Sequence, residues 1–159
     1  MTIAKQLEIA LAEVIQNHAD LGGQTTIRPW QTLRFAGQFN DKNDRHFPCL
    51  DIRAGSPSVD NDQVGWHSDV IITCGTIAED DRDHQIISDL YNEVFNVIVH
   101  LHDNSCKCGD LWQEFKSKLN GNFAIAGMTV SSGDTPADID NLLIMTIGVT
   151  FYFAIQLEV

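Results

Sequence analysis

The chain has 159 residues, 43% of them hydrophobic and 20% charged, which fits one soluble globular domain and argues against wholesale disorder. Ten Lys and Arg against 22 Asp and Glu give a formal net charge of −12. A field of that sign disfavours nucleic acid and acidic membrane surfaces as bound partners. Four cysteines are too few for a secreted disulfide framework, so we expect reduced thiols. The first 18 residues lack the uninterrupted apolar core of a secretory signal, which makes a cytoplasmic origin the default expectation.

The N-terminal segment predicts an amphipathic helix over residues 3–18. Thr2 stands where an N-cap side chain accepts a backbone hydrogen bond, and two glycines follow the expected end. The apolar residues that recur at helical spacing are Ile3, Leu7, Leu11, Val14 and Ile15.

Three strands are expected next. Apolar and polar residues alternate over 27–35, and Pro29 denies the ladder one donor, so this is an edge strand or one that begins after Trp30. After a polar loop at 37–46, the segment FPCLDIRAG predicts a short strand in which Cys49, Leu50 and Ile52 supply apolar contacts. WHSDVIITCGTI (66–77) predicts a third strand with a continuous apolar middle.

The hydrophobic period then changes to 3.6, which predicts a second helix over about 83–101. Its expected apolar face consists of Ile86, Ile87, Leu90, Val94, Val97, Ile98 and Leu101. A small third helix is expected in GDLWQEFKSKL, with Asp110 in the capping position.

Two strands close the chain. FAIAGMTVSS (123–132) predicts a fourth strand, residues 132–136 predict a turn, and the final stretch is expected to return antiparallel to the fourth strand. The apolar run 142–155 would span about 21 Å as a helix, too short for the roughly 30 Å of a bilayer core. Its odd positions are all apolar, which is typical of a strand with one face on a core, and we expect a bend or bulge at Gly148.

The order α-β-β-β-α-(α)-β-β predicts an α+β domain over residues 1–159. We expect an antiparallel or mixed sheet with two main helices packed on one face.

The segment HLHDNSCKC contains four potential metal ligands, namely His100, His102, Cys106 and Cys108. Their His-x-His and Cys-x-Cys spacing lacks the gaps with which zinc knuckles wrap a tetrahedral ion, so a helix-to-helix turn is the preferred interpretation and no metal site is predicted. The acidic stretch 78–83 is interpreted as stabilising the start of the second helix. The acidic stretch 132–141 lacks the closing Glu of a calcium loop and is interpreted as a hairpin tip. Catalytic motifs are scarce, and no enzyme activity is predicted.

Three segments resemble the tail terminator proteins of long-tailed bacteriophages, the class of the lambda-type minor tail protein U. The first is the N-terminal helix followed by the strand FPCLDI (47–52). The second is DVIITCGTIAEDDRDHQIISDLYNEV, a strand that runs through an acidic link into a helix. The third is the ending GMTVSSGDTPADIDNLLIMTIGVTFYFAIQLEV. The likeness covers nearly the whole chain and is one of element order and pattern.

The resemblance implies a structural virion protein that forms a ring, usually a hexamer, on the end of the tail tube. Such a ring ends tube polymerisation and joins the tail to the head-side connector, without catalysis or cofactor. The implied partners are further copies of the chain, the tail tube protein and the head-completion or neck connector protein. The resemblance also implies that DNA passes through the channel without specific binding, that no membrane is involved, and that assembly takes place in the host bacterial cytoplasm.

Subunit contacts in such a ring are expected at two places, the closing strand as a sheet edge and the loop 37–46 as a reaching arm. The loop could equally be a plain surface loop. The residues expected at these contacts are Phe39, Asn40, Asp41, Lys42, Asn43, Asp44, Arg45, Phe151 and Phe153. The competing hypothesis is a small cytoplasmic metal-binding domain or enzyme that uses His100, His102, Cys106 and Cys108.

Overall fold

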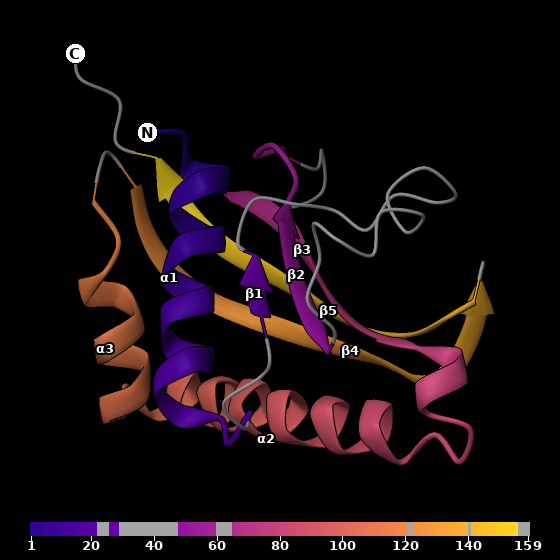
Figure 1. Ribbon diagram of the computed structural model, residues 1–159. Helices are drawn as coiled ribbons and strands as arrows, with labels where there is room; N and C mark the ends of the chain where they lie inside the picture. Colours follow the sequence, from indigo (N-terminus) through magenta and orange to yellow (C-terminus); the bar gives the residue numbers. More distant parts are fainter. Residues whose placement is uncertain (22–25, 29–47, 60–64, 121–122, 140, 156–159) are drawn as a thin grey trace.

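The computed structural model describes residues 1–21, 26–28, 48–59, 65–120, 123–139 and 141–155 (Figure 1). In chain order the elements are α1 (Ile3–His18), β1 (Thr26–Arg28), β2 (Cys49–Ala54), β3 (Trp66–Ile77), a 3-10 turn (Ala78–Asp80), α2 (Gln85–Lys107), α3 (Asp110–Ser117), β4 (Phe123–Ile139) and β5 (Leu142–Ile155).

The five described strands form one sheet in the order β1-β2-β3-β5-β4. β1 pairs parallel to β2, and every other neighbouring pair is antiparallel, so the sheet is mixed. The α+β class predicted from the sequence is confirmed. The expected antiparallel pairing of the last two strands is also confirmed, and the last strand lies between β3 and β4.

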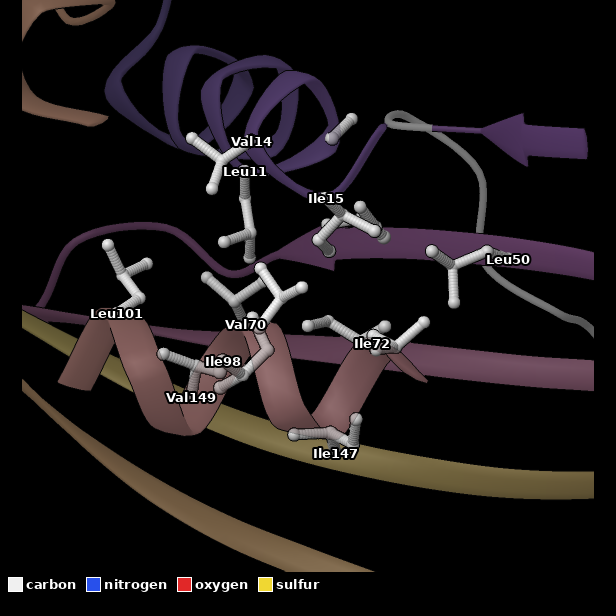
Figure 2. Close-up of a cluster of buried hydrophobic side chains, with 14 of the residues drawn as sticks. Leu11, Val14, Ile15, Leu50, Val70, Ile72, Ile98, Leu101, Ile147 and Val149 are labelled. Carbon is white, nitrogen blue, oxygen red and sulfur yellow. The ribbon is translucent and has the colours of Figure 1, made fainter. Parts of the chain in front are cut away.

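All three helices belong to one layer on one face of the sheet. α1 contacts β1 and β2, α2 runs along β3, β5 and β4, and α3 packs against α1 and α2 (Figure 1). Side chains from α1, α2 and the inner face of the sheet meet in a single large cluster. Figure 2 shows Leu11 and Ile15 of α1 above Val70 and Ile72 of β3, with Ile98 of α2 nearby.

Apolar residues alternate with small or polar ones along β5, and this alternation accounts for which of its side chains are buried. The odd-numbered residues of β5 from Leu143 to Phe153 are at most 4% exposed, because they point at the helices. The even-numbered residues Thr146, Gly148, Thr150 and Tyr152 are half-buried on the opposite face, which we call the outer face. A strand with a two-residue period and one apolar face is the arrangement that the sequence predicts.

The bend predicted at Gly148 is wrong. β5 pairs with β3 without interruption from Leu142 to Phe153, and the register shifts of this region lie in β4 instead. Gly148 lies opposite Ser131, whose Oγ would be 2.5 Å from a Cβ at position 148. The glycine therefore permits a close side-chain approach across the strand pair rather than a bend.

The turn predicted at 132–136 is also wrong, because β4 continues through this segment to Ile139. The register jumps between the pairs Gly133–Thr146 and Ala137–Ile144, so β4 carries extra residues that its partner lacks. Such a bulge accommodates turn-prone residues within a strand. Pairing resumes up to Ile139 and Leu142, and the chain reverses next to Asn141, whose φ is 66°.

Helix α1 has the predicted bounds, and the Oγ1 of Thr2 accepts a hydrogen bond from the backbone N–H of Lys5 at 3.2 Å. Helix α2 begins later and ends later than predicted, and it ends where Cys108 adopts a left-handed backbone conformation with φ 52°. The predicted apolar face is wrong at Ile86, which is 41% exposed. Tyr91, which the prediction left out, is buried.

Helix α3 is not capped by Asp110, which is its first residue. The capping oxygen comes from Asn104 of α2, whose Oδ1 accepts the backbone N–H of Leu111 at 3.1 Å. A side chain seven positions earlier thus satisfies one of the free N–H groups at the start of the helix.

Glu8 is a buried acidic residue that joins α1 to the sheet. It is 3% exposed, and its Oε1 accepts the backbone N–H of Ala54 at 2.9 Å. Burial raises the pKa of Glu8 above its ordinary value of 4.5; the Ala54 hydrogen bond, then Arg53 and Lys5, only partly oppose this. The folded protein therefore holds the Glu8 proton more tightly than the unfolded chain does.

Two substitutions at Glu8 separate the hydrogen bond from the charge. Glu8→Ala leaves the Ala54 N–H without its acceptor and should lower the free energy of unfolding by about 1–3 kcal/mol. Glu8→Gln keeps an acceptor and removes the charge, so it should be more stable than the native chain above the folded-state pKa. That advantage should shrink as the pH falls towards 4.5, because protonation of Glu8 then stabilises the native protein. Urea unfolding over this pH range measures both effects, and a pH-independent difference would contradict the prediction.

Candidate functional site

A groove of about 670 Å³ lies where the end of α1 meets α2 and α3. Its floor is partly apolar, and its walls carry three carboxylates, two imidazoles and two amides. The described lining residues are His18, Glu93, Asn96, Val97, His100, Asn104, Asp110, Leu111 and Glu114. No sequence pattern predicts this groove, because α1 lies far along the chain from α2 and α3 and contacts them only in the folded protein.

Several polar groups of the groove hold the helices together. His18 Nε2 lies 2.6 Å from Glu114 Oε2, which ties the end of α1 to α3. Glu93 Oε2 accepts the backbone N–H of Asp20 at 3.2 Å, which ties the segment just after α1 to α2. The groove can therefore be understood as the junction of three helices, with polar contacts that fix their ends.

The four candidate ligands of the 100–108 segment do not come together. His100 is exposed and lines the groove. His102 lies two residues further along the helix, about 200° around its axis, and so faces another direction. Cys106 and Cys108 are exposed at the end of α2. Among the described residues, no group of three or more His, Cys, Asp or Glu side chains is arranged to hold a metal ion.

The acidic stretches 78–83 and 132–141 lie in different elements of the fold. Asp81 is 1% exposed and accepts the backbone N–H groups of Ile86 and Ile87 at 2.9 and 2.8 Å, at the start of α2. Thr76 Oγ1 also donates to Asp81, at 3.2 Å. The interpretation that this stretch stabilises the helix start is confirmed. The second stretch lies mostly within β4 and not in a loop.

Cys49 and Cys74 are buried thiols, and Cys106 and Cys108 are exposed ones. Burial, and secondarily the neighbouring Cys49, raises the pKa of the Cys74 thiol far above its usual range. Cys74 is therefore protonated at neutral pH and is a poor nucleophile.

The residues expected at subunit contacts have different outcomes. Residues 39–45, which include Phe39, Asn40, Asp41, Lys42, Asn43, Asp44 and Arg45, lie outside the described residues. Phe151 and Phe153 are 0% and 2% exposed, so within this chain they are core residues and not surface residues. The expectation that the closing strand is a sheet edge is wrong, because β5 lies between β3 and β4. Strand order depends on pairing between distant segments, which the periodicity of one strand does not reveal.

Two surfaces of the described sheet are not occupied by its helices. One is the outer face, which is exposed around Ile71, itself 53% exposed. At the end of the sheet near the start of α2 the same face is buried, in a small second apolar cluster of Cys49, Leu142 and Ile144. The other surface is the edge of β4, which no further described strand pairs with.

No helix among the described residues is both long enough and apolar enough to cross a membrane. No protein-family model matches the chain. No curated protein is significantly similar to it in sequence.

Proposed function

We propose that the chain is a structural subunit of a bacteriophage tail, which forms a ring, hexameric in related systems, on the end of the tail tube. The observation that carries this proposal is the one-sided sheet: α1, α2 and α3 occupy one face, while among the described residues no helix covers the middle of the outer face and no strand pairs with the far side of β4. A closed ring requires two different surfaces on every subunit, and a sheet with a free edge and a free face offers them.

The resemblance to tail terminators supports the same proposal. The three segments on which it rests form α1 with β2, β3 with α2, and β4 with β5. In this proposal the ring ends polymerisation of the tube and presents a surface to the connector on the head side. The protein then belongs to the tail or neck of the virion and assembles in the host cytoplasm.

The net charge of −12 fits a channel that DNA must traverse. A negatively charged wall repels the phosphate backbone and so disfavours the electrostatic adhesion by which proteins hold DNA. The proposed partners are accordingly further copies of the chain, the tail tube protein and the connector protein. The proposed role involves no catalysis and no cofactor.

Electron microscopy of growing tail tubes tests the proposal. Addition of the purified protein to polymerising tail tube protein should shorten the tubes and add ring-shaped density at one end. Heat-unfolded protein at the same concentration is the control and should leave tube length unchanged. Tubes that grow to the same length with bare ends would contradict the proposal. A zinc-containing monomer in native mass spectrometry would instead favour the metal-binding hypothesis for His100, His102, Cys106 and Cys108.

A further inference from the structure

The edge of β4 is long and its middle is regular. β4 pairs with β5 on one side, and no other described strand lies on its other side. Its register with β5 shifts between Ile125 and Gly127 and again between Gly133 and Ala137. Between these shifts, Gly127–Gly133 forms an uninterrupted ladder that is about 23 Å long at 3.3 Å per residue. We call this segment the β4 edge.

The β4 edge lacks the features that normally prevent edge-to-edge association. Natural edge strands carry charges, prolines or bulges that stop another strand from pairing with them. In this strand those features lie only at or beyond the ends of the segment, as the two register shifts, Asp134, Pro136 and Asp138. Residues 119–133 contain no Asp, Glu, Lys, Arg or His, although 20% of the chain is charged.

The side chains of the β4 edge are compatible with an added strand. Thr129 and Ser131 are exposed on the outer face, where they would meet the side chains of a neighbouring strand. Met128 is buried against the helices and anchors the segment in the core of its own subunit. Unpaired backbone donors and acceptors of an edge bind an extended segment through main-chain hydrogen bonds.

We propose that the β4 edge binds an extended segment of a second copy of this chain, so that the sheet continues from one subunit to the next. The charge distribution selects this occupant. Two copies that each carry −12 repel one another, and close contact is opposed least where neither places a carboxylate. The β4 edge is such a neutral surface. The inference rests on the proposed function only for the ring: repeated head-to-tail addition of this kind forms a ring when the rotation between neighbours closes, and an open filament when it does not.

Charge placement on the β4 edge tests the inference. The double variant Thr129→Asp with Ser131→Asp puts two carboxylates at the proposed contact, on positions that are exposed in the single subunit. Gln16→Asp with Gln113→Asp adds the same charge to exposed positions of α1 and α3 and is the matched control. Sedimentation velocity over a concentration series should show at least about tenfold weaker self-association for the edge variant and little change for the control. Circular dichroism and the thermal midpoint establish that both variants fold.

Hydrogen exchange provides a second, independent measurement on the native chain. Within residues 127–133, the amides that point away from β5 should become protected as the protein concentration rises, because the added strand bonds to them; the other amides already face β5. Equal self-association of the two double variants, or a native chain that stays monomeric, would overturn the inference. A ring that the edge substitutions leave intact would overturn it while supporting the proposed function. A closed dimer that the substitutions disrupt would support the β4 edge and contradict the ring.

Discussion

Replacing Phe151 by alanine should lower the free energy of unfolding by about 3–5 kcal/mol, the range observed when a buried aromatic side chain is removed from a core. Phe151 is 0% exposed in the middle of β5, and its ring stacks on Phe115 of α3 with the centroids 5.1 Å apart. The substitution removes the ring contact between β5 and α3 and leaves a cavity that the close-packed surroundings fill only in part. Urea denaturation monitored by circular dichroism measures the loss.

Ile71→Ala is the control for this substitution. Ile71 lies on the neighbouring strand β3 but points to the outer face, where it is 53% exposed, so its removal should change stability by no more than about 0.5 kcal/mol. The comparison also tests whether Phe151 is a core residue of its own subunit and not a subunit contact. If Phe151 faced a neighbouring subunit and not its own core, the isolated chain would lose little stability on its truncation.

Replacing Asp81 by alanine should cost about 2–4 kcal/mol, because the substitution affects a helix cap and a buried polar contact together. The carboxylate accepts the backbone N–H groups of Ile86 and Ile87, which have no partner within the first turn of α2. It also accepts from Thr76 of β3 and so fixes the connection between the sheet and the longest helix. The same unfolding measurement applies, and hydrogen exchange at Ile86 and Ile87 should increase.

Asp83→Ala is the matched control, since it removes a carboxylate from the same acidic stretch. Asp83 is exposed and accepts only a longer hydrogen bond of 3.3 Å from the N–H of Gln85. Its removal should cost less than about 1 kcal/mol. If the two variants lost equal stability, the acidic stretch would act through its summed charge at the helix N-terminus and not through the buried cap.

Elements whose pattern is set by their own neighbours along the chain could be predicted well. The 3.6-residue period and Thr2 determine α1 with its observed ends, and the strict alternation from Leu143 to Phe153 identifies which face of β5 is buried. The prediction failed where a distant segment decides the outcome. β4 continues through a turn-prone stretch because β5 is available to pair with it, and α3 takes its cap from Asn104 of α2.

The candidate surfaces also divide into features that the local sequence sets and features that distant segments decide. The sequence by itself determined that the chain is acidic, that β5 has one apolar face, and that residues 119–133 are free of charge. Only the tertiary structure decided that β5 lies inside the sheet and β4 at an edge, and that His18 meets Glu114 at the three-helix groove. The reason is physical: local periodicity specifies which side of an element is buried, whereas its neighbours are chosen by packing and pairing between segments far apart in the chain.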